Sequence, residues 1–303
     1  MIYTLVFKYT SYISFIIFVI GIAYKWWKWS SMPLHLRWEL YPVPHEALKA
    51  EYGGSYLEEV NWWLKGRLVS VFGELKEMFK EMLFIVRIYR SNKRLWLLSY
   101  SFHLGIYLIL IWFILIFLGA ITTTYIGIPI PSMNPWAIFV YYVTIIIGIV
   151  GDVLAIVGGL GLLVRRLVSP VLRDYTTIPD YLNLILVLLA LMSGLSAWFF
   201  DPSFNLAREF MSSLINPLLP PPYLNVITIV HLAIVQILIA YIPFSKITHF
   251  IGKYFTYHKV LWDDEPNMGQ LDGKIQELLK LKLSWSDPHI KSGDTWINNA
   301  SGW

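Results

Sequence analysis

Apolar residues gather along the chain in five stretches that are long enough to cross a lipid bilayer as helices. A helix rises about 1.5 Å per residue, so a hydrocarbon layer of about 30 Å requires about 20 apolar residues. The stretches cover residues 9–24, 95–118, 136–164, 181–200 and 223 to about 248. This pattern predicts an all-α integral membrane protein built as a five-helix transmembrane bundle.

A different periodic pattern lies before the second span. Within residues 67–89, apolar side chains recur every three or four residues and charged side chains lie mostly opposite, which predicts an amphipathic helix. Because Arg90, Lys93 and Arg94 follow it, we expect this helix to lie along the inner membrane surface. A helix packed on a partner protein would give the same pattern.

Lys and Arg are concentrated in alternate connections, and this asymmetry predicts the orientation of the bundle. Twelve lie in residues 25–94 and six lysines follow His249, whereas residues 119–135 contain none. Because basic loops are retained in the cytoplasm, we expect an external amino terminus and a cytoplasmic carboxy terminus in the cell membrane. Basic residues at membrane edges favour lipid head groups as partners and argue against nucleic acid.

Composition supports the membrane location and limits the chemistry. Of the 303 residues, 56% are hydrophobic and 15% are charged, and the mean hydropathy is +0.56, which is far too apolar for a soluble protein of this length. No cysteine is present, so the chain holds no thiolate-ligated iron–sulfur cluster. If electrons move through it, haem must carry them and a partner must take them onward.

Three histidines in or at the end of predicted spans are the candidate functional residues. His231 and His249 are eighteen residues apart, which in one helix is a whole number of turns over about 27 Å, and Pro243 would kink that helix. The second span carries His103. Imidazole is a common axial ligand of b-type haem, and histidine in a membrane is usually functional, so these residues suggest a membrane cytochrome. For each histidine alone, a hydrogen bond to a neighbour is the alternative.

The predicted topology places these histidines at different depths. His103, near the start of an outward span, and His249, at the end of an inward span, both fall in the cytoplasmic half. His231 falls in the outer half. The pattern thus divides the chain into a first transmembrane helix (1–27), a cytoplasmic segment with the amphipathic helix (28–94), a four-helix haem-binding membrane region (95–250) and a cytoplasmic tail (251–303).

The tail is mixed in charge and weakly periodic near residues 275–283. It is either a docking arm for a cytoplasmic subunit or a solvated end. Tryptophan is enriched at protein interfaces, so the number of tryptophans favours docking. These residues are Trp262, Trp285, Trp296 and Trp303.

The third span carries one acid and a row of small residues. An unpaired carboxylate inside a membrane is costly, so we expect Asp152 to be protonated, paired or facing a wet cavity, with a proton path or quinone contact as its function. Ser193 and Gly194 on the fourth span are expected to serve packing. Glycines let a helix or a flat macrocycle approach closely, and the sequence leaves both open. The glycines are Gly148, Gly151, Gly158, Gly159 and Gly161.

Several motifs resemble those of a known family. The segment Pro243-Phe-Ser-Lys-Ile-Thr-His249, with His231 eighteen residues earlier, closely resembles the fifth helix of the gamma subunit of respiratory nitrate reductase, a five-helix dihaem cytochrome b that oxidises quinol. Residues 34–46 and 92–105 look more like the related cytochrome b subunits of complexes associated with dissimilatory sulfite reductase and similar complexes of sulfate reducers. The resemblance covers residues 1 to about 255.

The resemblance implies a set of haem ligands. It pairs His103 with His249 at an inner haem b and assigns His231 to an outer one. We therefore expect two haems, with one haem as the minimum. In the nitrate reductase subunit the second helix supplies two histidines ten residues apart, but the position ten after His103 is Phe113. The outer haem would then be five-coordinate, take a ligand from elsewhere or be missing; the retained His231 makes loss the least attractive.

The function implied by the resemblance is electron transfer across the membrane, with no group chemistry in this chain. Menaquinol would bind near His231, and electrons would pass inward to a cytoplasmic iron–sulfur subunit resembling the catalytic subunit of heterodisulfide reductase. Further membrane and extracellular cytochrome or iron–sulfur subunits are expected in such a complex of anaerobic sulfur metabolism. The alternatives are a cytochrome b serving a nitrate reductase, hydrogenase or formate dehydrogenase, and a non-redox transporter or membrane anchor.

Overall fold

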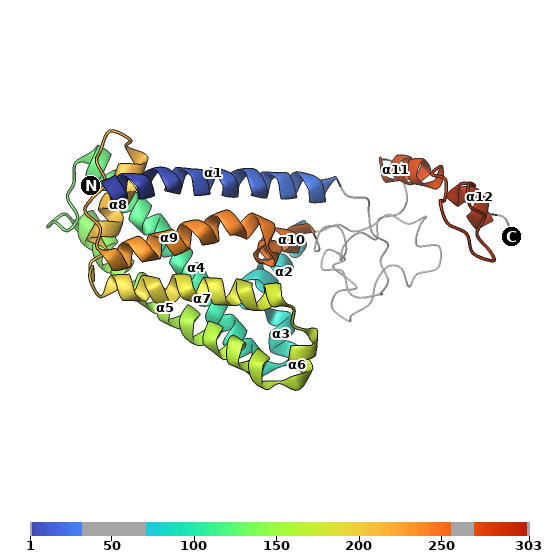
Figure 1. Ribbon diagram of the computed structural model, residues 1–303, viewed down its shortest axis with the longest axis horizontal. Helices are drawn as coiled ribbons and strands as arrows, with labels where there is room; N and C mark the ends of the chain where they lie inside the picture. The colour runs from blue at the N-terminus through green and yellow to red at the C-terminus, as the bar shows by residue number, and fades with distance from the viewer. Residues whose placement is uncertain (1, 32–70, 256–269, 302–303) are drawn as a thin grey trace. The chain divides into compact units, whose positions relative to one another are not determined.

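The computed structural model describes residues 2–31, 71–255 and 270–301. Within these ranges, five helices are long and apolar enough to cross a membrane, which confirms the predicted all-α bundle (Figure 1). They are α1 (Ile2–Ser30), α4 (Lys93–Ile121), α5 (Pro135–Val168), α7 (Ile178–Trp198) and α9 (Val226–Tyr241). All five belong to one compact unit, residues 1–32 and 79–254, and the remaining residues form a second unit.

Asparagine caps set the starts of three of the spanning helices. The side-chain oxygens of Asn92, Asn134 and Asn225 accept hydrogen bonds from backbone N–H groups in the first turns of α4, α5 and α9, at 3.0, 2.9 and 2.8 Å. These bonds satisfy N–H groups that have no partner inside the helix. Pro135 at the first position of α5 loses no hydrogen bond there.

Helices α4 and α5 lie against each other along their length (Figure 1). A methyl carbon added to Gly105 would lie 2.5 Å from the carbonyl oxygen of Gly151, and one added to Gly158 would lie 2.7 Å from that of Leu98. These distances are too short for any side chain, so the two backbones are in direct contact. These three glycines therefore serve close packing between helices, as in other membrane bundles.

Helix α9 packs between α1 and α7. Gln236 of α9 is buried and forms three hydrogen bonds with α1: its Oε1 accepts from Thr10 at 2.8 Å, and its Nε2 donates to Ser11 Oγ at 2.8 Å and to the carbonyl oxygen of Phe7 at 2.9 Å. A polar side chain satisfied in this way fixes the register of one helix on another in an apolar medium.

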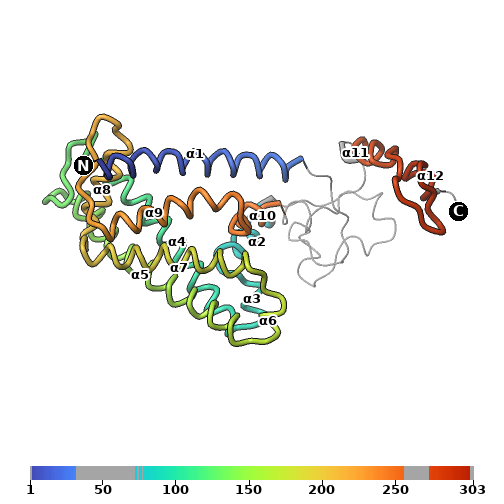
Figure 2. The backbone as a smooth tube through the Cα atoms, viewed as in Figure 1, coloured from blue at the N-terminus to red at the C-terminus, as the bar shows by residue number. Residues whose placement is uncertain are grey.

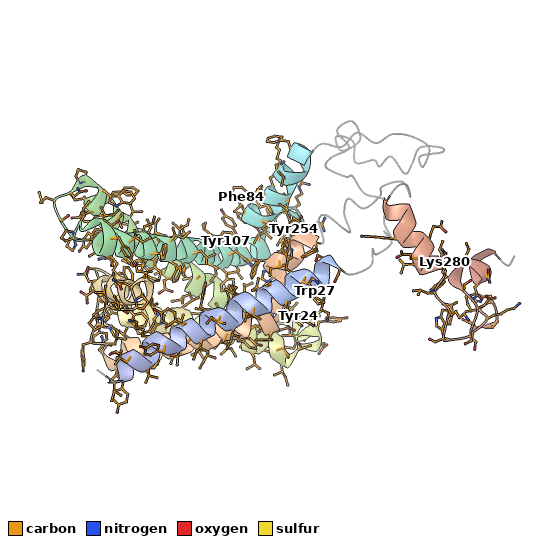
Figure 3. The ribbon with its side chains drawn as sticks, turned by 90° about the horizontal axis from the view of Figure 1, so that it is seen from above. Tyr24, Trp27, Phe84, Tyr107, Tyr254 and Lys280 are labelled. Atoms are coloured by element: carbon orange, nitrogen blue, oxygen red, sulfur yellow. The ribbon has the colours of Figure 1, made fainter. Side chains whose placement is uncertain are left out.

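The predicted amphipathic helix is present but ends at Phe84, five residues before its predicted end, and a second short helix follows. Residues 71–84 form α2 (Val71–Phe84) and the next helix is α3 (Val86–Ser91), with Ile85 between them in the left-handed region at φ 51°. The carbonyl oxygens exposed by this break are satisfied from α4. Trp96 Nε1 donates to that of Phe84 at 2.7 Å, and the Tyr107 hydroxyl donates to that of Met82 at 2.6 Å (Figure 3).

The fifth span is also interrupted. Helix α9 ends at Tyr241, and 3-10 turns at Ile242–Phe244 and Lys246–Thr248 precede α10 (His249–Phe255) (Figure 2). Pro243 has no N–H to continue the helix, so the predicted kink is a full break. The expectation that His231 and His249 share one face of a continuous helix is therefore wrong.

The described part of the tail folds on itself. It contains α11 (Gln270–Leu279) and α12 (Trp296–Ser301), with isolated β-bridges that pair Lys282 with Thr295 and Asp287 with Ile290. The rings of Trp285 and Trp296 lie 6.4 Å apart. Other features of the segments that we predicted to be cytoplasmic lie outside the described residues, namely the motif at residues 34–46, residues 67–70, Trp262 and Trp303.

Candidate functional site

Two of the three candidate histidines meet at the end of the bundle where α10 lies. His103 projects from the third turn of α4, and His249 is the first residue of α10. Their ring centroids are 6.0 Å apart and the rings are nearly perpendicular, at 80°. His103 is half-buried and His249 is exposed. The structure thus brings together the pair that the family resemblance assigned to the inner haem.

Each of these imidazoles has its Nδ1 next to a backbone carbonyl. His103 Nδ1 lies 2.7 Å from the oxygen of Ser99, and His249 Nδ1 lies 3.3 Å from that of Lys246. A carbonyl only accepts, so Nδ1 carries the proton and Nε2 keeps its lone pair. Histidines that bind metals commonly donate the other ring N–H in this way, which fixes the tautomer.

The separation of the two rings suits one iron between them. A histidine nitrogen coordinates a transition metal at about 2 Å, so two rings on opposite sides of one metal have centres about 6 Å apart. The observed 6.0 Å between the centroids of His103 and His249 agrees with this value. Within the described residues, no group of three or more His, Asp or Glu side chains converges as a metal-ion site. The pair therefore fits a centre that supplies its remaining ligands itself, as haem does.

Contacts from two other helices hold the turn that precedes His249. Lys25 of α1 donates to Thr248 Oγ1 at 2.7 Å, and Lys246 forms an ion pair with Asp180, in the first turn of α7, at 2.8 Å. Thr248 is 2% exposed. These contacts place His249 even though the helix that carries it is not continuous with α9.

The third candidate, His231, lies apart from this pair and contacts α7. Its Nδ1 is 3.0 Å from Ser193 Oγ, which itself donates to the carbonyl oxygen of Ala190 at 2.9 Å. The serine hydroxyl and the carbonyl oxygen of Ala190 are therefore the acceptors available to the Nδ1 proton, and Nε2 is again unprotonated. A methyl carbon on Gly194 would lie 3.1 Å from His231 Cε1, so this glycine makes room for the ring.

No second imidazole accompanies His231 in the part of the chain that the structure describes. Phe113, which stands where the family pattern has a histidine, is 51% exposed on α4. Sequence reasoning assigned Ser193 and Gly194 to packing and missed their contacts with His231. Nothing in the spacing of two separate helices reveals such a pair, so only the fold could show it.

Asp152 is half-buried on α5 and forms no ion pair or hydrogen bond with any described residue. Of the expected states, a paired carboxylate is therefore not observed. In apolar surroundings the ionised form of an unpaired carboxyl is costly. A role for Asp152 with a quinone or a proton remains a prediction.

Two buried donors that the sequence did not indicate lie near α8 (Asn205–Ile215), at the other end of the bundle. Arg208 is 4% exposed, its Nη2 donates to the carbonyl oxygen of Ser203 at 2.7 Å, and its guanidinium lies 5.7 Å from the ring centre of Tyr141. Burial lowers the pKa of this guanidinium, although arginine stays charged. Arg208 Nη1 and Trp112 Nε1 have no hydrogen-bond partner among the described residues.

Comparison with known proteins connects this arrangement to one family. The family model of the nitrate reductase gamma subunit matches residues 87–262, which is more than half of the chain. The chain belongs to this family. The matched region contains four of the five spanning helices and all three candidate histidines. The protein is thus a multi-pass membrane protein of the nitrate reductase gamma subunit family.

A curated relative extends the comparison to nearly the whole chain. It is the Hdr-like menaquinol oxidoreductase cytochrome b-like subunit of Archaeoglobus profundus, and it is 24% identical over 274 residues. The alignment covers 83% of this chain and 77% of the relative. Family and relative together confirm the resemblance to membrane cytochrome b subunits.

Proposed function

We propose that this member of the gamma subunit family is the haem b-containing membrane subunit of a menaquinol oxidoreductase complex and transfers electrons between menaquinol and a cytoplasmic iron–sulfur subunit. The observation that carries the proposal is the approach of His103 and His249 to 6.0 Å between ring centroids. The name of the relative supports menaquinol as the substrate and a heterodisulfide reductase-like subunit as the partner.

His103 and His249 would hold a haem at the α10 end of the bundle. Haem bound there supplies a reversible one-electron carrier whose potential depends on its ligands and burial. The chain contributes rings held in one tautomer by Ser99 and Lys246, and an anchored turn before His249. A cysteine-free chain leaves iron–sulfur chemistry to the partner.

His231 would hold a second haem from one side chain of this chain. Its Nδ1 is satisfied by Ser193 and its Nε2 is unprotonated, so its chemistry suits iron. Since no other imidazole lies beside it among the described residues, such a haem would have an open or weakly held sixth position. We therefore expect a mixed spectrum, with a low-spin and a high-spin component.

Absorption and electron paramagnetic resonance spectra of the purified complex test the main assignment. His103→Ala or His249→Ala should remove one low-spin b-type signal and stop quinol-linked reduction of the partner subunit, because each removes one of two ligands. His289→Ala is the matched control, since His289 is exposed on the described tail and should leave the spectrum unchanged.

Two results would contradict the proposal in different ways. A complex in which both His103→Ala and His249→Ala keep every haem would show that the ligands lie elsewhere. A purified wild-type protein that shows no reducible haem spectrum would contradict electron transfer and support the non-redox membrane anchor. The choice among sulfur metabolism, nitrate reductase, hydrogenase and formate dehydrogenase would follow from mass spectrometry of the co-purifying subunit.

A further inference from the structure

A groove lies on the surface between the start of α4 and the end of α5. These two helix ends lie at the same end of the bundle as α3 and α6 (Pro170–Tyr175) (Figure 1). It has a volume of about 430 Å³. Most of its lining is apolar, and its polar residues come from the ends of the two helices. The lining residues are Asn92, Arg94, Leu95, Leu98, Gly161, Val164, Arg165 and Val168.

Helices α4 and α5 are in contact where Leu98 and Gly161 line the groove. Gly161 lies against Leu98, and a methyl carbon added to it would be 2.5 Å from Leu98 Cδ2. Val164 and Val168, one and two turns further on, are 55% and 73% exposed. In a membrane these side chains face lipid, so the groove opens towards acyl chains rather than towards another part of the bundle.

Two guanidinium groups belong to the groove, and neither is neutralised. Arg94 is exposed and Arg165 is half-buried. Neither forms an ion pair or hydrogen bond with any described residue, and no acidic side chain lines the groove. Lys93 and Arg166 are their neighbours in sequence, which adds positive charge at this end. The site therefore combines apolar walls with a cationic rim.

We propose that this groove binds one anionic phospholipid, with the phosphate between Arg94 and Arg165 and a hydrocarbon chain along Leu98 and Val164. Arginine presents several N–H donors in a fixed plane that matches phosphate oxygens, and basic pockets between membrane helices suit lipid head groups. A neutral quinone has no charge to match two guanidiniums. The proposal rests on the membrane location and not on the proposed electron transfer.

Lipid retention by the purified complex tests this assignment. The delipidated complex is incubated with vesicles of equal parts phosphatidylglycerol and phosphatidylcholine, re-purified, and examined by native mass spectrometry. The wild-type complex should retain one phosphatidylglycerol, preferred at least tenfold over phosphatidylcholine. The double variant Arg94→Gln/Arg165→Gln should lose this preference, and Val164→Trp should lower retention by filling the groove with both arginines intact.

Arg166→Gln is the matched control, because it removes the same charge from the same end of α5 but does not line the groove. It should keep the tenfold preference. A double variant that still prefers phosphatidylglycerol would overturn the proposal, as would an Arg166→Gln variant that loses the preference to the same extent. Retention of menaquinone instead of lipid, abolished by Val164→Trp, would assign the groove to quinone and also overturn it. Unchanged helical circular dichroism in each variant shows that folding is retained.

Discussion

Helix α4 meets two neighbours in opposite ways. Against α5, Gly105, Gly151 and Gly158 bring the two backbones into direct contact, so no molecule can enter between the helices at these glycines. Towards α10, the contact is made by the rings of His103 and His249, whose centroids are 6.0 Å apart. Both contacts lie on a single apolar helix, yet the first leaves no room for a ligand and the second joins the two imidazole rings that we propose as haem ligands.

The difference shows how one helix can be both a structural and a functional element. Small residues allow dispersion contacts over a long stretch and provide the stability of the pair. At the contact between α4 and α10, the histidine side chains keep the two backbones apart, so the imidazole rings make the contact. The glycines of α5 thus stabilise the helix pair. The candidate functional residues are the histidines of α4, α9 and α10.

The largest expected effect comes from a substitution in the glycine contact. Gly158→Ala adds a methyl carbon 2.7 Å from the carbonyl oxygen of Leu98, which forces the helices apart. We expect a loss of about 1–3 kcal/mol in the free energy of unfolding, even though alanine favours a helix by about 1 kcal/mol. Unfolding of the protein from mixed micelles by added denaturing detergent measures this value.

Gly252→Ala is the control for that experiment. A methyl carbon on Gly252, in α10, would lie 3.8 Å from the ring of Trp29, which is ordinary contact. This substitution should leave the stability unchanged or raise it by up to about 1 kcal/mol. Equal losses in both variants would show that α4 and α5 do not depend on backbone contact.

An intermediate effect is expected on the spin state of the haem that we assign to His231. Phe113→His restores the imidazole that the family pattern has at this position of α4, and it should convert the high-spin component assigned to His231 towards low spin. Ile114→His is the control, because Ile114 is the next residue and is 54% exposed, close to the 51% of Phe113. Two fully low-spin haems in the wild-type protein would show that an unidentified residue already supplies the sixth ligand.

The smallest effect is expected from the serine that contacts His231. Ser193→Ala removes one of the two acceptors available to the Nδ1 proton, which makes the imidazole a weaker electron donor to iron. Loss of a hydrogen bond of about 1 kcal/mol raises a one-electron potential by about 40 mV. Redox titration followed by absorbance measures the shift for the high-spin component.

Ser196→Ala provides the comparison for this titration. Ser196 lies on the same helix, and its hydroxyl donates to the carbonyl oxygen of Met192 at 2.8 Å without touching His231. It should leave both potentials unchanged. If Ser193→Ala shifts the potential of the low-spin component and not that of the high-spin component, His231 does not belong to the high-spin haem.

The five spans could be predicted because apolar length alone defines them, but their ends could not. The first span was predicted over residues 9–24, whereas α1 covers Ile2–Ser30. Lys8, just before the predicted span, is 2% exposed and its Nζ donates to the carbonyl oxygens of Pro217 and Leu219 at 3.0 and 2.8 Å. Such a partner, more than two hundred residues away, leaves no local pattern.

The candidate site was predictable in its residue types and less so in its geometry. Histidines in apolar spans could be recognised from the sequence, and the family resemblance supplied the pair that the structure brings together. The regular spacing of His231 and His249 gave a wrong geometry, because Pro243 ends the helix between them. The helix break at Ile85 was missed because the amphipathic pattern continues through it, and donors on α4 compensate for it.

The break at Pro243 has a consequence for how the two histidine positions can change over evolutionary time. In a continuous helix, inserting or deleting one residue would rotate every later side chain by about 100°, so both positions would have to be conserved together. Here two 3-10 turns, tied separately to α1 and α7, stand between them. A change of length in these turns can therefore be absorbed without rotating the face of α9 that carries His231, so the two histidines are not tied to one helical register.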